Sequence, residues 1–173
     1  MSIAEVQAEP KAIAEGDRLP DATLNRATPD GPQEVSMARL TEGRKVVIFA
    51  VPGAFTPTCH SAHMPSFLSV HDALRAKGVD EVICLAVNDP FVLQAWGDET
   101  GATTAGITLV SDGASEFTRA VGMIFDAPQV GFMGRSVRYA MLVEDGVVRI
   151  LHVEQGRGTC ELSSGPAMLA AMG

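Results

Sequence analysis

Residues 52–59 read PGAFTPTC and place a thiol where a short apolar run gives way to a helical pattern. The run 44–51 ends at Pro52, and Cys59 begins the amphipathic pattern 59–77. A cysteine in the first turn of a helix meets unpaired backbone N–H groups and the positive end of the helix dipole, and both favour the thiolate. The thiolate is the nucleophilic form of cysteine, so this pattern indicates thiol chemistry at Cys59.

Two residues just before Cys59 could assist that chemistry. Thr56, three residues earlier, can form a hydrogen bond with the same sulfur, and Pro52 would fix the loop and shield it from water. The alternative is that Cys59 only packs, as most free cysteines do. The change from strand to helix at this point favours the chemical role. The TxxC spacing also matches the place of the CxxC of thioredoxin-like motifs, with threonine instead of the first cysteine.

Histidines follow Cys59 closely enough to act on it. His63 lies four residues later, on the same helical face, where it would be a charge or hydrogen-bond partner for the site. The rival interpretation is a metal site formed by Cys59, His60 and His63. Only two of these three residues share a helical face, and no further cysteine or carboxylate completes a fourfold set. We therefore expect no metal.

The charge balance limits the classes of partner. Thirteen Lys and Arg residues stand against 21 Asp and Glu residues, which gives a net charge of −8. This excess of negative charge disfavours nucleic acid and anionic membranes as partners. No apolar run approaches transmembrane length. With 173 residues, the chain is expected to form one domain, 1–173, in which about residues 1–15 are an N-terminal extension.

The three cysteines point to a reducing compartment. The start, MSIAEVQAEPKAIAEGD, lacks a basic region followed by an apolar stretch, and its acids argue against a mitochondrial presequence. An odd number of cysteines also makes a purely structural set of disulfides implausible. We therefore expect a cytoplasmic protein with Cys59, Cys84 and Cys160 reduced at rest.

Short β-branched runs alternate with helical patterns along the chain. The strands are expected at 44–51, 81–87, 107–112, 138–145 and 147–153. The helices are expected at 59–77, after Asn88-Asp89-Pro90, at 114–121 and at 165–173. A Pro-Asp-Gly turn within 22–37 predicts an N-terminal β-hairpin, and Asp145-Gly146 joins the last two strands. The order predicts an α/β fold: a central mixed β-sheet flanked by helices on both faces.

The stretch VPGAFTPTCHSAHMPSF (51–67) resembles the active-site segment of peroxiredoxins, more narrowly of the type II (peroxiredoxin 5) subfamily of the AhpC/TSA superfamily. The family's Pro-xxx-Thr-xx-Cys signature is complete here. The resemblance continues through VICLAVNDPFVLQAW (82–96), GRSVRYAMLVEDGVV (134–148) and VEQGRGTCELSS (153–164), so it covers nearly the whole chain. It implies a thioredoxin-like fold, a homodimer, and reduction of hydrogen peroxide and alkyl hydroperoxides without a metal or organic cofactor.

The resemblance also assigns roles to residues. Cys59 would be the peroxidatic cysteine, whose thiolate attacks the peroxide and becomes a sulfenic acid. Thr56 would hydrogen-bond the peroxide, and Arg138 would lie against the thiolate and stabilise the developing charge. Arg135 is a rival for the place of Arg138, but it is expected to be a solvated arginine in a loop. The family pattern has a histidine at the position of His63 as well.

Two cysteines compete to resolve the sulfenic acid. Cys160 matches the resolving cysteine of animal peroxiredoxin 5 proteins and falls in a glycine-containing loop, which gives the access that thiol exchange requires. Cys84 matches a position proposed to resolve in plant type II members, but it falls inside an expected strand and fits a buried hydrophobe better. A cycle with Cys59 alone is also open. The electron donor is accordingly thioredoxin, glutathione or glutaredoxin.

Apolar residues in expected loops are candidates for the dimer interface that the resemblance implies. Phe55, Phe91 and the loop 131–136 carry aromatic or methionine side chains that would be unfavourable to leave in water. The alternative for each is that it folds back onto its own core.

Two other functions compete with a thiol peroxidase. A disulfide reductase of the thioredoxin type is disfavoured, because that chemistry uses cysteines two residues apart and none are so close here. A redox-silent thioredoxin-fold protein that binds clients or signals peroxide would not need the set Pro52, Thr56, Cys59 and Arg138.

Overall fold

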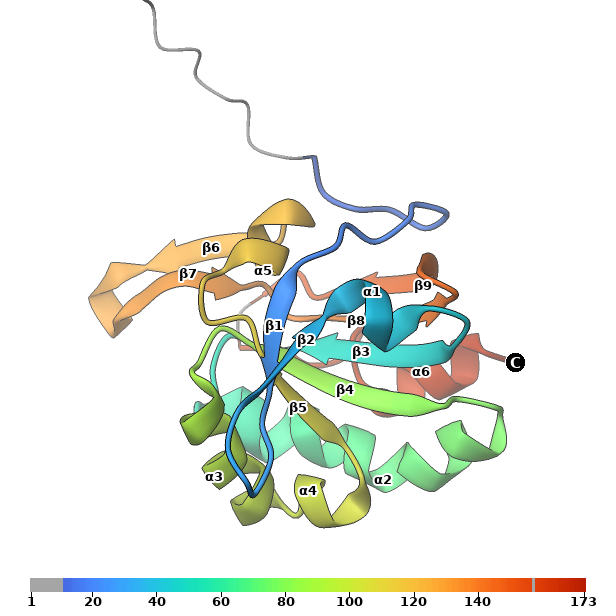
Figure 1. The fold of residues 1–173 in the computed structure, drawn as a ribbon, viewed down its shortest axis with the longest axis horizontal. Coiled ribbons are helices and arrows are strands. Elements are labelled where there is room, and N and C mark those ends of the chain that lie inside the picture. The colour runs from blue at the N-terminus through green and yellow to red at the C-terminus, as the bar shows by residue number, and fades with distance from the viewer. Residues whose placement is uncertain (1–10, 157) are drawn as a thin grey trace, which may run out of the picture.

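The sequence KVVIFA forms strand β3 (Lys45–Ala50), in the interior of a seven-stranded sheet. All β3 side chains after Lys45 are buried, because other elements cover both faces of the sheet (Figure 1). The computed structural model describes residues 11–156 and 158–173. The first ten residues of the expected N-terminal extension therefore lie outside the described residues, whereas Ile13 is buried and its N–H bonds the carbonyl of Val121.

The sheet is mixed, with the strand order β2-β1-β5-β4-β3-β8-β9. The inner strands β3, β4 and β5 are parallel, and β1, β2, β8 and β9 join them by antiparallel pairing. The remaining strands of this sheet are β1 (Thr23–Arg26), β2 (Gln33–Ser36), β4 (Glu81–Ala86), β5 (Thr108–Ser111), β8 (Tyr139–Glu144) and β9 (Val147–Val153). The expected mixed sheet and N-terminal hairpin are confirmed.

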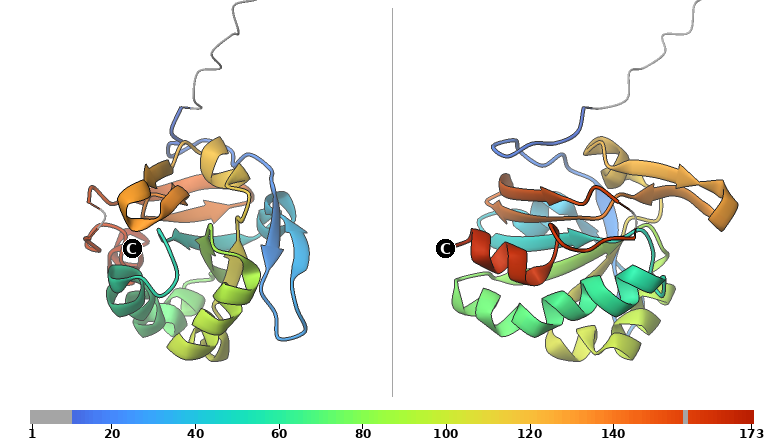
Figure 2. Two further views of the ribbon diagram at one scale, coloured as in Figure 1. Left: turned by 90° about the vertical axis from the view of Figure 1, so that its left-hand side faces the viewer. Right: turned by 180° about the vertical axis from the view of Figure 1, so that it is seen from behind.

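Alternating side chains of the sheet build a separate core on each face. In β3, Val47 and Phe49 enter one core, and Val46 and Ile48 enter the other. The first core is covered by α2 (Met64–Ala76), α3 (Pro90–Thr100), α4 (Ala102–Ala105) and α6 (Gly165–Ala171). The second is covered by the shorter helices α1 (Met37–Thr41) and α5 (Glu116–Ala120). Figure 2 shows these two layers from the side and from behind. The expected helices on both faces are confirmed.

A second hairpin, absent from the sequence prediction, extends away from the central sheet (Figures 1 and 2). It pairs β6 (Ile124–Ala127) with β7 (Phe132–Ser136) through the 3₁₀ turn η2 (Pro128–Val130). The prediction of a loop at 131–136 is therefore wrong, because most of this range forms strand β7. Gly131 and Gly134, both with positive φ, interrupt the alternation by which strands are recognised.

Within the described residues, every helix is too short or too polar to cross a membrane.

Candidate active site

Cys59 opens a single π-helical turn, Cys59–His63, that leads directly into α2. The carbonyl of Cys59 accepts a hydrogen bond from the N–H of Met64, five residues on, and the cysteine is fully buried. The preceding loop is held by Asn88, whose side-chain oxygen accepts the N–H of Ala54 at 2.8 Å. The expected place of Cys59 in the first helical turn is confirmed, although this turn is wider than an α-helical one.

Arg135 anchors the loop before Cys59 from the second hairpin. Its Nη1 donates to the carbonyl of Pro52 at 3.0 Å, and its guanidinium lies 4.9 Å from the ring centre of Phe132. A Cβ atom at Gly53 would lie only 2.7 Å from that Nη1, so a side chain at this position would displace the guanidinium from its place. The expectation that Arg135 is a solvated loop arginine is wrong. The sequence could not show this role, because strand β7 was not recognised.

Arg138 contacts the sulfur itself. It lies directly before β8, and its Nη2 donates to Cys59 Sγ at 3.2 Å. The residue is 2% exposed. A buried guanidinium needs acceptors or negative charge nearby, and a thiolate at Cys59 would supply both. The structure thus brings Arg138 to Cys59, as the resemblance implied.

His63 is a neutral hydrogen-bond partner of that arginine. Its Nε2 lies 2.9 Å from the carbonyl oxygen of Ser163, which can only accept, so Nε2 carries the proton. Its Nδ1 then accepts from Arg138 Nη1 at 3.1 Å. Burial and the charge of Arg138 lower the pKa of His63 to about 3, against smaller raising effects of Ser163 and Glu154. Of the two expected roles, hydrogen-bond partner and charge, the structure supports the first.

These bonds leave the histidines unsuited to a metal. Both ring nitrogens of His63 are occupied, and the Nδ1 of His60 accepts from Trp96 Nε1 at 3.0 Å. The part of the chain that the structure describes holds no cluster of three or more His, Cys, Asp or Glu residues arranged to bind a metal ion. The rival metal site of the sequence analysis has no support here.

Thr56 lines the opening of the site, and its hydroxyl already donates a hydrogen bond within the loop. Its Oγ1 donates to the carbonyl of Gly53 at 2.6 Å, so its oxygen presents lone pairs to its surroundings. A cavity of about 420 Å³ is lined by Pro52, Thr56 and Arg138 together with apolar residues of the second hairpin. Three of the predicted site residues, Pro52, Thr56 and Arg138, therefore line one opening, and the hydroxyl oxygen of Thr56 can accept a hydrogen bond there.

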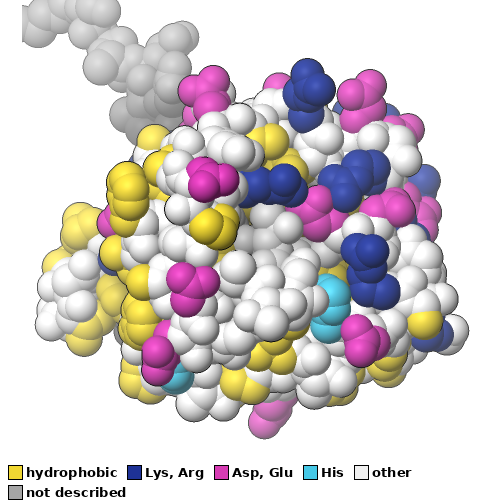
Figure 3. Space-filling view, turned by 60° about the horizontal axis from the view of Figure 1, so that its bottom comes forward, with side chains coloured by type: hydrophobic (Ala, Val, Ile, Leu, Met, Phe, Trp, Pro, Cys, Tyr) yellow, Lys and Arg dark blue, Asp and Glu magenta, His cyan; other side chains and the backbone are white. Residues whose placement is uncertain are grey.

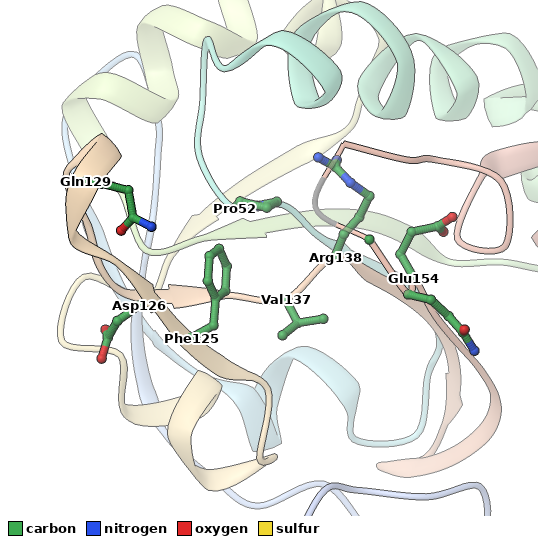
Figure 4. A pocket seen from close by; sticks show the side chains of 9 residues that line it. Pro52, Phe125, Asp126, Gln129, Val137, Arg138 and Glu154 are labelled. Atoms are coloured by element: carbon green, nitrogen blue, oxygen red, sulfur yellow. The ribbon is translucent and has the colours of Figure 1, made fainter.

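A second cavity, of about 350 Å³, shares Pro52 and Arg138 with the first and continues toward the end of β9. In Figure 4, Arg138 lies between Pro52 and Glu154. Glu154 and Ser163 belong to this region, but no periodic pattern singled them out in the sequence. They act through hydrogen bonds between distant segments, which the sequence alone does not reveal.

The other two cysteines differ from Cys59 in their surroundings. Cys84 is fully buried in β4, and burial, with a smaller effect of Cys59, raises its pKa well above the ordinary value. Cys160 is partly exposed between β9 and α6. Burial raises its pKa, with smaller raising effects of Glu154 and Cys59, against the lowering effects of the Arg138 charge and a hydrogen bond with Ser163. Cys84 thus fits the expected buried hydrophobe, and Cys160 lies within electrostatic range of the site.

Known proteins resemble this chain over nearly all of its length. The Redoxin family model matches residues 14–169. A chloroplastic peroxiredoxin-2E-2 of Oryza sativa subsp. japonica is 49% identical over 92% of this chain and 72% of its own length. Peroxiredoxin-2B of Arabidopsis thaliana is 42% identical over 92% of this chain and 98% of its own. The crystal structure of reduced Prx3 from Vibrio vulnificus in complex with H₂O₂ has a TM-score of 0.86 and 44% identity, covering 93% and 99% of the two chains.

The thioredoxin-like sheet and the arginine-bonded cysteine define a redox-active thiol protein. With relatives of this identity and coverage, the chain belongs to the peroxiredoxin family, within the AhpC/TSA superfamily. It is an oxidoreductase of the thiol-dependent peroxidase type, and the redox-silent alternative is not favoured.

Proposed function

We propose that Cys59 is the residue that reduces hydrogen peroxide and alkyl hydroperoxides, with Thr56 and Arg138 orienting the peroxide. The observation that carries this proposal is the 3.2 Å hydrogen bond from Arg138 Nη2 to Cys59 Sγ in a buried site. Arg138 lines the opening together with Pro52 and Thr56 and also contacts Cys59 Sγ, so a small peroxide bound in the opening would lie beside the group that bonds the sulfur.

The chemistry needs only groups already in place. The Cys59 thiolate attacks the distal oxygen of ROOH, the O–O bond breaks, and the products are a Cys59 sulfenic acid and an alkoxide that takes a proton from water. The peroxide proton can point at the Thr56 oxygen, whose own proton goes to Gly53. Arg138 then lies where negative charge develops on the departing oxygen.

Thiolate formation alone cannot account for a fast peroxidase. An ordinary cysteine with a pKa of about 8.5 is roughly 3% ionised at pH 7, so complete ionisation gains only about 30-fold in rate. A less basic thiolate is also a weaker nucleophile, which removes part of that gain. The remaining acceleration must come from donors and acceptors fixed around the two peroxide oxygens.

For the second half of the cycle, we place Cys160 first as the resolving cysteine. Its thiol attacks the Cys59 sulfenic acid, which forms a disulfide and releases water. Its partial exposure and its electrostatic range to Cys59 support this order, and a thioredoxin would then reduce the disulfide. The alternative is direct reduction by glutathione or glutaredoxin. Either donor system suits a reducing compartment, and we propose the cytoplasm.

Intact mass after one equivalent of hydrogen peroxide separates the two routes. Loss of two hydrogens, abolished by Cys160→Ser and not by Cys84→Ala, would support the Cys59–Cys160 disulfide. Gain of one oxygen, followed by a glutathione adduct when glutathione is added, would support the route through Cys59 alone. Absence of any mass change would contradict the proposed peroxidase site.

A homodimer is the proposed assembly. Phe55 and Phe91 are 50% and 70% exposed, so the alternative that they fold back onto their own core is wrong. Val130 and Met133 of the second hairpin are also exposed. Figure 3 shows hydrophobic side chains gathered on the side from which this hairpin extends. Sedimentation velocity should show a dimer that Phe91→Glu converts to a monomer; a monomeric wild type would contradict the proposal.

A further inference from the structure

The carboxylate of Glu154, directly after β9, accepts four hydrogen bonds from the segment that follows Cys160. The donors are the backbone N–H groups of Glu161, Leu162 and Ser163, at 2.8, 3.2 and 2.8 Å. The hydroxyl of Ser163 adds a fourth bond at 2.8 Å. Glu154 is buried, and among residues 11–156 and 158–173 the hydrogen-bond donors to its carboxylate oxygens all come from this one segment.

The bonds keep this buried carboxyl group ionised. Burial raises the pKa of Glu154, but the hydrogen bonds from Glu161, Ser163 and Leu162 together outweigh burial and lower the pKa to about 2. Hydrogen bonds to an ionised acceptor are about twice as strong as those between neutral groups. The segment Cys160–Ser163 is therefore held by a strong anchor, although it has no regular secondary structure.

The same segment is linked to the sulfur of Cys59. The carbonyl of Ser163 accepts the Nε2 proton of His63, and His63 Nδ1 accepts from Arg138, which donates to Cys59 Sγ. A second link is direct, because the N–H of Glu154 donates to the carbonyl of Arg138 at 2.9 Å. One carboxylate thus connects the segment that carries Cys160 with the arginine that contacts Cys59.

We propose that Glu154 is a positioning residue that holds the Cys160–Ser163 segment and thereby fixes Arg138 against Cys59. This inference rests on the proposed function of Cys59 as the reacting thiol. It adds a coupling: if the segment leaves Glu154, His63 loses its Ser163 acceptor, and the hydrogen bonds that fix Arg138 beside Cys59 are weakened. The site is then set for peroxide only while the segment is held.

The direction in which the ionisation of Cys59 shifts distinguishes a positioning role of Glu154 from a direct effect of its negative charge. Removal of the Glu154 charge alone would stabilise a nearby thiolate, because like charges repel, and would let Cys59 ionise at lower pH. Loss of the anchor would instead loosen Arg138, so Cys59 would ionise at higher pH. The positioning role predicts that the second effect is the larger.

The experiment uses Glu154→Gln in the full chain with Cys160→Ser, so that Cys59 is the thiol followed by alkylation with iodoacetamide. The pH profile of Cys59 alkylation should move to higher pH. By NMR, amide exchange at 161–163 should become on the order of 10- to 100-fold faster, since bonds to a charged acceptor are lost. Glu161→Gln is the matched control: it removes the same charge from an exposed side chain and should change neither readout.

An alkylation profile that moves to lower pH or stays unchanged, with faster exchange at 161–163, would overturn the coupling to Arg138. Unchanged exchange would overturn the anchor itself. If Glu154→Gln does not fold, Ser163→Ala removes only the hydroxyl bond and should shift both readouts in the same direction by a smaller amount; no shift would overturn the proposal. Neither readout needs peroxide, so an inactive wild type would reject the proposed function without deciding this inference.

Discussion

Cys59 and Cys84 are both fully buried and belong to the same hydrophobic cluster, yet their surroundings differ. Cys84 lies within the sheet, opposite Phe49 of β3 and Leu109 of β5, and burial raises its pKa well above the ordinary value. Cys59 lies where the chain leaves the sheet, and Arg138 donates to its sulfur. Under the proposed function, burial alone therefore does not decide which thiol reacts, whereas a donor directed at the sulfur does.

The largest effect should follow removal of the Cys59 sulfur, whereas removal of the Cys84 sulfur should leave the rate almost unchanged. Cys59→Ser should lower the rate constant for peroxide consumption by at least about 10⁴-fold, because no other group replaces the nucleophile. Cys84→Ala should keep that rate constant within about twofold and lower the free energy of unfolding by roughly 1–2 kcal/mol through the cavity it leaves. Stopped-flow kinetics and urea unfolding measure the two quantities. Loss of activity in Cys84→Ala with an intact fold would break the comparison.

Removal of the Arg138 donor should leave Cys59 a buried thiol without a hydrogen-bond donor from this arginine, and therefore much less reactive with peroxide. Arg138→Ala should reduce the rate constant with peroxide by about 10²- to 10³-fold, the usual loss when one transition-state donor is removed. Arg149→Ala is the matched control, since its side chain is 54% exposed and pairs with Glu144. A stopped-flow rate that stays near the wild-type value in Arg138→Ala would contradict the central role of the donor.

Thr56→Val sharpens the comparison at the peroxide itself. Valine keeps the shape of threonine but removes the acceptor that the Gly53 bond orients, so the rate constant should fall by about 10²-fold. The fold and the exposure of Cys59 should not change. Thr104→Val, at an exposed position of α4, is the control. Equal rate constants in Thr56→Val and Thr104→Val would contradict a role of the Thr56 hydroxyl in the reaction with peroxide.

The smallest effect concerns His63 and pH. The unfolded chain binds a proton at this residue as the pH falls below 6.5, whereas the folded protein, with the His63 pKa at about 3, does not. The unfolded state then binds more protons, so stability should fall as the pH drops from 6.5 toward 3. His63→Gln should show a smaller decrease in urea stability between about pH 7 and about pH 5. If His63→Gln loses as much stability as the wild type over this pH range, groups other than His63 cause the loss.

The sequence predicted the central sheet, because its β-branched runs are long and both faces are buried. It did not predict β6–β7, whose short strands contain positive-φ glycines, or the helices α1 and α4, which are only five and four residues long. At the site, Cys59, Thr56 and Arg138 were found through motifs. Arg135 and Glu154 were not, because their roles depend on contacts between segments far apart in the chain.

The most direct test traps the sulfenic acid. Cys160→Ser protein is treated with one equivalent of hydrogen peroxide in the presence of dimedone, and the labelled peptide is identified by mass spectrometry. The account predicts one label, on Cys59, and a large loss of that label in Arg138→Ala. A label on Cys84, or equal labelling of Cys59 with and without Arg138, would contradict the claim that the arginine donor selects the reacting thiol.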